Sequence, residues 1–266
     1  MIGYNALGQL GRLGNQMFQF AALKGIAKNR GYQFCLPPSQ NKEEYKDHQL
    51  LIPFVLGDTS PLNIQFIDPD RPVVQEAGFS FDENLFNNCP DWVDIRGFFQ
   101  TEKYFKHIRD NLLQDFKFKD EIIEPCNEMM DSFDTPPVSL HIRRTDYITN
   151  PNHTALDISY YEKALKKFDA DREVIVFSDD TKWCYEHPLF SDDRFLIADG
   201  NSNYVDMCLM TMCSYHIIAN SSFSWWGAWL SDSKKVIAPS GWFAESNNQL
   251  LDTKDLIPED WTIIKS

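Results

Sequence analysis

The regular alternation of apolar runs and helical runs over residues 131–266 constrains the fold more than any other feature of this chain. Short apolar runs are separated, in most cases, by runs whose apolar residues recur at helical spacing. Such alternation is typical of βαβ units with a mostly parallel sheet, so we expect a Rossmann-like α/β half. The expected strands are Val138–Ile142, Glu173–Phe177, Phe195–Ala198, His216–Ala219 and Lys235–Ala238, and the expected helices are Ser159–Phe168, Asp180–Tyr185, Tyr204–Met212 and Ser222–Leu230.

The first half of the chain has fewer elements that can be predicted. Asn15–Arg30 has helical spacing and is followed by Gly31, a typical C-terminal cap, and Glu102–Phe116 has the pattern of an amphipathic helix. At 266 residues, the chain can form one large domain or two of about 130 residues each. Further expected segments are strands at 32–36 and 92–99, a linker at 131–137, and either a last strand or a packed tail at 261–264.

The composition restricts the possible partners. The formal net charge of −14 argues against nucleic acid or an anionic membrane, because both favour a basic face. The six cysteines show no C-x-x-C spacing, which indicates reduced thiols rather than zinc ligands or a disulfide framework. The sequence shows neither a signal-peptide pattern at its start nor an apolar run of about 18 residues. We therefore expect a cytoplasmic protein with at most peripheral membrane association.

The segment His141–Asp146 ends the first expected strand of the second half and contains two adjacent arginines and a carboxylate. Ligands of open α/β sheets bind beyond the strand ends, and guanidinium groups there suit a phosphate, so we expect a nucleoside diphosphate. Because successive strand side chains face opposite ways, Arg143 lies on the same side as His141, and we prefer this pair for the ligand. For Arg144, an ion pair with Asp146 and direct contact with the ligand remain alternatives.

Two other segments have the form of a loop that enters a helix. Glycines 8, 11 and 14 differ in spacing from the dinucleotide fingerprint, and no clear strand precedes them, which disfavours a nicotinamide cofactor. The backbone of this loop either holds an anion or simply makes a tight turn. Likewise, Ser221 or Ser222 either helps to hold a phosphate or is an ordinary helix cap. Trp225, Trp226 and Trp229 are more typical of a core than of a sugar platform.

Four ordered segments together resemble the bacterial α-1,2-fucosyltransferases of glycosyltransferase family 11, and the resemblance covers most of the chain. Gly11–Phe20 resembles the family's G-x-x-G-N-Q-M-F-Q motif, and Gly97–Phe105 its G-[YF]-F-Q-x-x-x-Y-F segment. His141–Tyr147 resembles H-x-R-R-x-D-Y, and Asn220–Trp229 resembles N-S-[ST]-F-S-W-W-x-A-W. Thr145 stands where glycine is usual in the family, and residues 41–90 match no part of the pattern.

The resemblance implies an α/β protein of the GT-B architecture, in which two Rossmann-like domains face a cleft. Residues 1–130 would be the acceptor side, and residues 131–266 would bind GDP-β-L-fucose. The implied reaction moves L-fucose, with inversion, to the 2-hydroxyl of a glycan acceptor, for which we expect a β-galactoside. A non-catalytic nucleotide-sugar or carbohydrate-binding protein and a fucosyltransferase acting on protein remain alternative functions.

The implied chemistry assigns roles to individual residues. Negative charge develops on the leaving GDP, so Arg143 at the β-phosphate would stabilise the transition state. Asp146, favoured over His153, would deprotonate the acceptor, although pairing with Arg144 would make it a poor base. For Asp206, an exposed charge at the start of a helix is the alternative to a contact with guanine. The residues expected to contact the donor are Arg12, Gly14, Asn15, His141, Arg144, Asp206, Ser221, Ser222 and Phe223.

We expect no metal requirement and no bound cofactor. Asp68-Pro69-Asp70 has the D-x-D spacing that holds Mn²⁺ in GT-A transferases, and Asp179–Asp180 and Asp192–Asp193 are further acidic pairs. None of these pairs adjoins the expected phosphate site in the sequence, and such pairs occur by chance in a chain this acidic.

Overall fold

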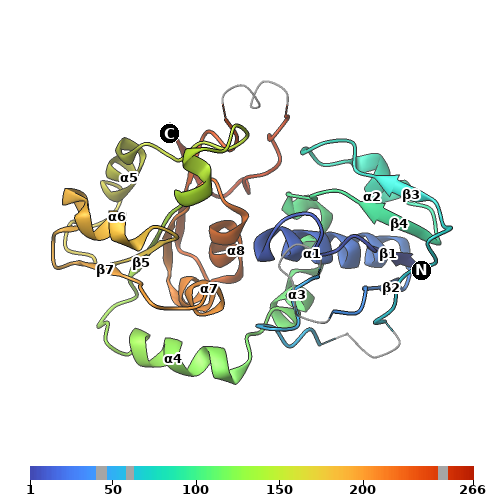
Figure 1. Cartoon of the computed structure of the whole chain (residues 1–266), viewed down its shortest axis with the longest axis horizontal. Coiled ribbons are helices and arrows are strands. Elements are labelled where there is room, and N and C mark those ends of the chain that lie inside the picture. The colour runs from blue at the N-terminus through green and yellow to red at the C-terminus, as the bar shows by residue number, and fades with distance from the viewer. Residues whose placement is uncertain (40–46, 58–62, 245–250) are drawn as a thin grey trace. The chain divides into compact units, whose positions relative to one another are not determined.

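The computed structural model describes residues 1–39, 47–57, 63–244 and 251–266, which form two compact units (Figure 1). Unit 1 comprises Met1–Lys119 and Leu251–Pro258, and unit 2 comprises Asp120–Leu250 and Glu259–Ser266. Each unit is α/β and contains a parallel sheet, so the predicted fold class is confirmed. Within the described ranges, no helix is both long and apolar enough to span a bilayer.

Helix α4 (Asp120–Met130) belongs to unit 2, so the chain first passes between the units after Lys119. The predicted halves were 1–130 and 131–266. The buried Cys126 of α4 packs on helix α7, where the thiol donates a hydrogen bond to the Val205 carbonyl at 3.6 Å. Residues 251–258 return to unit 1, where the Asp255 carboxylate accepts a hydrogen bond from Nζ of Lys103 at 2.5 Å. The border therefore follows the packing of α4 and not the linker-like segment 131–137.

Unit 2 is built on a six-stranded parallel sheet in the order β10-β9-β8-β5-β6-β7. The strands and helices predicted for residues 138–264 are all present, with small shifts of their bounds, and residues 262–264 are a strand. The strands are β5 (Val138–Ile142), β6 (Val174–Ser178), β7 (Phe195–Ile197), β8 (Tyr215–Ile217), β9 (Lys235–Pro239) and β10 (Thr262–Ile264). The helices are α5 (Ile158–Leu165), α6 (Thr181–Glu186), α7 (Asn203–Met212) and α8 (Ser222–Leu230), with 3₁₀ turns η3 (Thr145–Ile148) and η4 (Pro188–Phe190).

Different helices cover the two faces of this sheet (Figure 1). Val138, Leu140 and Ile142 of β5 pack in one core with apolar side chains of α5 and α6. His141 points the opposite way and contacts Ser224 of α8, which packs against α7. Helices α5 and α6 therefore lie on one face and α7 and α8 on the other, as the alternation of side chains along a strand requires.

Unit 1 contains a four-stranded parallel sheet in the order β2-β1-β4-β3. Helix α1 begins at Leu13 and is capped by Gly31, whose φ of 69° is left-handed. A short strand, β1, precedes the glycine-rich loop, so the expectation that no strand precedes it is wrong. The predicted helix 102–116 is broken into two 3₁₀ turns and a short helix. The elements are β1 (Ile2–Gly3), α1 (Leu13–Arg30), β2 (Phe34–Cys35), β3 (Val73–Gln75), α2 (Glu83–Asn88), β4 (Val93–Arg96), η1 (Glu102–Tyr104), η2 (Lys106–Ile108) and α3 (Arg109–Asp115).

Candidate active site

Arg143, the first residue after β5, is held between two carboxylates. Its Nη2 lies 2.5 Å from Oδ1 of Asp146, and its Nη1 lies 3.1 Å from Oδ2 of Asp179. The guanidinium also lies over the Tyr147 ring, 5.2 Å from the centroid. The side chain is 16% exposed, and the two ion pairs fix the orientation of its guanidinium. A guanidinium oriented in advance in this way suits an oxyanion.

Arg144 faces a different set of partners. Its Nε lies 3.1 Å from Oδ2 of Asp180, and its guanidinium lies over the Trp183 ring at 3.9 Å from the centroid. Of the two alternatives for Arg144, the ion pair with Asp146 is not found, because Asp146 pairs with Arg143 and Arg144 pairs with Asp180, which follows β6. An arginine that is both paired and stacked orders the loop around it.

Asp179, at the end of β6, is a site residue that the sequence suggested only as half of an acidic pair. Besides Arg143, it accepts hydrogen bonds from the backbone N–H of Arg144 at 2.9 Å and from the Thr145 hydroxyl. Asp179 could have been predicted from its position after a strand. Because β6 runs parallel to β5, the residues that follow the two strands are neighbours. Among the described residues, His, Cys, Asp and Glu side chains form no group of three that could hold a metal ion.

His141 is buried, and its imidazole packs against α8 and forms a hydrogen bond with it. Nδ1 lies 2.9 Å from Oγ of Ser224, and the ring lies 5.7 Å from that of Phe223. Burial, with a smaller effect of the Arg143 charge, lowers the pKa of His141 to about 3, so the ring is neutral at physiological pH. The structure thus places the His141 ring against Ser224 and Phe223, in the first turn of α8.

The N-terminus of α8 follows β8 through residues 218–221. The Ser221 hydroxyl accepts a hydrogen bond from the backbone N–H of Phe223 at 3.4 Å, so it is a helix cap. Nδ2 of Asn220 donates to the carbonyls of Thr154 at 3.1 Å and Trp242 at 3.0 Å. Ser222 and Phe223 are half-buried at this end. The three tryptophans that follow are core residues, as expected: Trp225, Trp226 and Trp229.

His153 lies close to the loop that carries Asp146. Its ring stacks on that of Tyr147 with centroids 4.6 Å apart, and the Phe243 ring lies 5.2 Å away. Burial lowers the pKa of His153 below the ordinary value, and the Asp146 charge partly opposes this effect. Both candidate bases therefore belong to the segment between β5 and α5.

Asp206 occupies the first turn of α7, which Ser202 caps. Nδ2 of Asn201 donates to Oδ1 of Asp206 at 3.1 Å. Burial, opposed in part by this hydrogen bond, raises the pKa of Asp206 to about 6. The carboxylate is thus half-buried and does not fit the alternative of a fully exposed helix charge.

The remaining predicted residues belong to unit 1. Arg12 is the N-cap residue of α1, and Gly14 and Asn15 lie in its first turn. Gly8 and Gly11 have φ values of 94° and 90°, so the loop needs glycine for its turn. Oδ1 of Asn15 accepts a hydrogen bond from Nε2 of Gln100 at 2.8 Å.

Arg143, Asp146 and Ser221 follow strands at a topological switch point of the unit 2 sheet, whereas Asp206 follows the edge strand β7. From β5 the strand order runs through β6 and β7 on one side, and through β8, β9 and β10 on the other. The carboxyl ends of β5 and β8, which lead to Arg143 and to Ser221, flank this point. Open α/β sheets bind their ligands at such a crevice.

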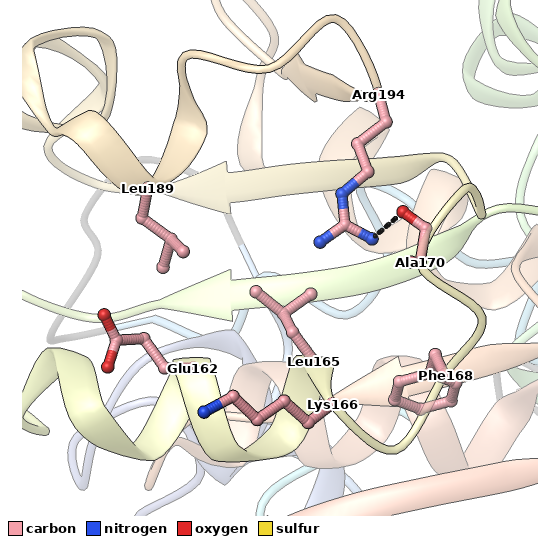
Figure 2. Close-up of a pocket in the computed structure, with 7 residues that line it drawn as sticks. All are labelled: Glu162, Leu165, Lys166, Phe168, Ala170, Leu189 and Arg194. Atoms are coloured by element: carbon pink, nitrogen blue, oxygen red, sulfur yellow. Dashed lines mark hydrogen bonds between the residues drawn. The ribbon is translucent and has the colours of Figure 1, made fainter.

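A separate pocket of about 360 Å³ lies in unit 2, lined by residues of α5, of η4 and of the segments that precede β6 and β7. Figure 2 shows Leu165 of α5, the following Lys166, Leu189 of η4 and Arg194 around it. Nη1 of Arg194 donates to the Ala170 carbonyl at 2.8 Å, so the guanidinium is turned toward the protein. The pocket contains none of the predicted site residues, and we do not assign the chemistry to it.

Known proteins with related sequences are glycosyltransferases. The chain is 32% identical to an α-1,2-colitosyltransferase of Escherichia coli, over 96% of this chain and 97% of the relative. It is 35% identical to the O-antigen biosynthesis glycosyltransferase WbnK of Escherichia coli, over 63% of this chain, and spans 62% of that relative. It is 27% identical to galactoside α-(1,2)-fucosyltransferase 1 of Bos taurus, over 85% of this chain and 66% of the relative.

Solved structures share the fold at low identity. The fucosyltransferase NodZ from Bradyrhizobium matches with a TM-score of 0.56 and 13% identity, over 91% of this chain and 96% of NodZ. POFUT1 in complex with GDP-fucose matches with a TM-score of 0.55 and 13% identity, over 87% of this chain and 94% of that one. The fold is therefore GT-B-like. The profile of Glycosyl transferase family 11 matches residues 1–265, and the chain thus belongs to this family of sugar-transferring enzymes.

Proposed function

We propose that the chain is an inverting α-1,2-fucosyltransferase that moves L-fucose from GDP-β-L-fucose to the 2-hydroxyl of a β-galactoside glycan. Family membership, the α-1,2-linkages named in its relatives and the GT-B-like fold support this proposal. The observation that carries it is the Arg143 guanidinium, held by Asp146 and Asp179 at the switch point of the unit 2 sheet.

Arg143 is oriented to stabilise the leaving group. As the bond between the fucose anomeric carbon and the β-phosphate oxygen breaks, negative charge grows on GDP, and a guanidinium fixed in advance stabilises it without reorganisation. The Asp146 side chain is 45% exposed and that of Asp179 is 20% exposed. An incoming phosphate would therefore take the place of Asp146 on Nη2, while Asp179 keeps the guanidinium in position.

The same exchange would release a base. Once the phosphate holds Nη2 of Arg143, the Asp146 carboxylate loses its ion pair and can accept the proton of the acceptor hydroxyl. The neutral ring of His153 is the second candidate, because its lowered pKa leaves a nitrogen able to accept a proton. In both cases the hydroxyl attacks the face of the sugar opposite the phosphate, which inverts β to α.

The other residues would complete the donor site. Ionised Asp206 would accept hydrogen bonds from the N–H groups of guanine, and Ser221, Ser222 and Phe223 would lie along the diphosphate and base. His141 would support the end of α8 through Ser224. Arg144 would order the loop after β5, and the residues contributed by unit 1 would be Arg12, Gly14 and Asn15.

Two further expectations belong to the proposal. The reaction would need no metal ion, because the guanidinium supplies the positive charge at the phosphate. A cytoplasmic location is supported by the six cysteines, all of which are buried as free thiols. Activity in EDTA and fractionation of the producing cells test these two points.

One observation favours a second donor sugar. The relative that matches almost the whole chain is an α-1,2-colitosyltransferase. Colitose lacks one hydroxyl that fucose carries, and a site that hydrogen-bonds a hydroxyl rejects the analogue without it by a large factor. Comparison of GDP-fucose with GDP-colitose therefore decides the donor.

The experiment measures GDP release in EDTA, with and without lactose or another β-galactoside, from GDP-fucose, GDP-colitose, GDP-mannose and UDP-galactose. We expect acceptor-stimulated release from GDP-fucose only, and an α-1,2-linked product by NMR. Stimulated release from GDP-colitose alone would change the donor, and transfer to a protein but to no glycan would change the acceptor class. Nucleotide binding without release under any condition would favour a binding protein.

A further inference from the structure

The Glu76 carboxylate, directly after β3 in unit 1, clamps the turn that follows β4. Glu76 is buried, with 7% exposure. Its Oε2 accepts hydrogen bonds from the backbone N–H groups of Phe98 and Phe99, both at 2.9 Å. The close approach requires Gly97, because a Cβ there would lie 2.5 Å from Glu76.

The turn has a conformation that needs such a clamp. Phe99 has a φ of 53°, in the left-handed region that aromatic residues rarely adopt. Its buried ring packs against Tyr4 and Tyr104, with centroids 6.1 Å and 5.3 Å away. Hydrogen bonds to a charged carboxylate are stronger than those between neutral groups, so Glu76 holds both amides of the turn. The clamp therefore fixes the direction in which Gln100 leaves it.

Gln100 connects this turn to the loop that begins α1. Its side chain is 6% exposed, and Nε2 donates to Oδ1 of Asn15 at 2.8 Å. Asn15 in turn packs over Gly11, where a Cβ would lie 2.0 Å from Nδ2 of Asn15. The two loops follow β1 and β4, which are neighbours at the switch point of the unit 1 sheet.

We infer that Glu76 is a positioning residue that, through the turn 97–100 and Gln100, sets the place of the Asn15 side chain and so prepares the unit 1 loop for the donor diphosphate. The inference rests on the proposed function, in which Asn15 contacts the donor. Glu76, a buried acidic residue outside the four motif segments, would thus act in donor binding without touching the donor.

The ionisation of Glu76 provides a way to observe the clamp. Burial, opposed by the two backbone N–H groups, raises the pKa of Glu76 to about 7, so both forms are present near neutral pH. The groups that face it are Tyr4, Asp82 and Tyr104. Burial raises the pKa of both tyrosines well above neutral, so neither titrates together with Glu76.

The first test uses the wild-type protein and no substrate. In an NMR titration, the amide protons of Phe98 and Phe99 and the side-chain amide protons of Gln100 should shift with one common midpoint. The Glu76→Gln variant should remove that transition from all three, and Glu83→Gln, an exposed residue of α2, should leave it unchanged. A Gln100 side chain that does not respond while the two backbone amides do would overturn the inference.

The second test measures kcat/KM for the donor. The charge-assisted bonds are lost in Glu76→Gln, so we expect a drop on the order of tenfold, with Glu83→Gln unchanged. Gln100→Leu should cost about as much, and the double variant no more than either one, because both act on Asn15. If the losses of kcat/KM in the two single variants add in the double variant, the inference is contradicted. A kcat/KM of Glu76→Gln within twofold of the wild-type value also contradicts it. A wild-type protein that transfers no sugar contradicts the proposed function instead, and the NMR titration still decides the role of Glu76.

Discussion

The guanidinium of Arg143 and the carboxylate of Asp179 meet at 3.1 Å, and this contact joins the ends of the neighbouring strands β5 and β6. The same carboxylate accepts hydrogen bonds from the Arg144 backbone N–H and the Thr145 hydroxyl. One acidic side chain thus fixes both the arginine and the backbone that follows it. The loop is held from the side, by a strand distant in sequence.

Arg143→Ala should abolish measurable transfer, and Arg143→Lys should lower kcat by roughly 10²- to 10³-fold, because an ammonium lacks the planar fork that lets a guanidinium hold Asp179 and the phosphate together. Circular dichroism should show an unchanged fold. Arg71→Ala, at an exposed ion pair with Asp68, is the matched control and should keep full activity. Near-normal turnover in Arg143→Lys would remove the leaving-group role.

Asp179→Asn should lower kcat by about tenfold while changing the donor KM little. The amide keeps the size of the side chain but removes the charge that orients Arg143, so the guanidinium loses its alignment mainly where charge develops. Steady-state kinetics with varied GDP-fucose separate the two constants. An effect on KM alone would mean that Asp179 only assists ground-state binding.

Asp146→Asn and His153→Gln distinguish the two candidate bases. If Asp146 is the base, Asp146→Asn lowers transfer by roughly 10²- to 10⁴-fold, and His153→Gln has a much smaller effect. Release of GDP without acceptor reports whether Arg143 still acts on the leaving group. The reverse order of effects, with the acid limb of the pH profile lost in His153→Gln, would assign the base to His153.

The affinity for GDP-fucose should fall below about pH 6. Asp206 accepts hydrogen bonds from guanine only when ionised, and burial raises its pKa to about 6. Protonation of Asp206 therefore removes the hydrogen-bond acceptor. The affinity should fall by at most tenfold for each pH unit, and GDP-fucose itself does not titrate in this range. Isothermal titration calorimetry between pH 5 and 8 checks this, and Asp206→Asn should bind weakly without this pH dependence.

Glu76 should make the free energy of unfolding decrease as pH rises, whereas the donor affinity described above increases as pH rises. Its pKa in the folded protein is about 7, above the ordinary value of 4.5. The folded state therefore binds the proton more tightly, and this stabilisation is complete below about pH 4.5 and is lost as pH rises through 7. Relative to Glu76→Gln, wild type should lose up to about 3 kcal/mol between these limits. Differential scanning calorimetry at pH 5 and 8 tests it; a constant difference between the proteins would contradict it.

The elements of unit 2 could be predicted because each strand is an apolar run and each helix has clear spacing. In unit 1, β1 is only Ile2–Gly3, too short to show a pattern, and Val73 on β3 is exposed. The helix predicted from 102 breaks near Phe105, where the 3₁₀ turns η1 and η2 meet. There, the Tyr104 carbonyl would lie only 2.1 Å from a Cβ on Gly25 of α1. Close packing against α1 therefore determines the backbone conformation of this segment.

The candidate site was predictable in its motif residues but not in their pairing. Arg143 directly follows β5, and its charge acts on the buried His141 ring. The partners of the arginines come from β6, because tertiary contacts select Asp179 and Asp180 and local spacing does not. Glu76 carries no motif at all, and only its two hydrogen bonds to the turn reveal it.

The tryptophans are distributed very unevenly between the two units. Of the seven indoles, only Trp92 belongs to unit 1, whereas α8 alone contains three. The rings of Trp225 and Trp229 stack with centroids 6.1 Å apart, and Trp261 lies 5.4 Å from Trp225. Intrinsic fluorescence will therefore report mainly on the melting of unit 2, with energy transfer among its indoles. A protein whose unit 1 has already unfolded could still emit almost like the native one.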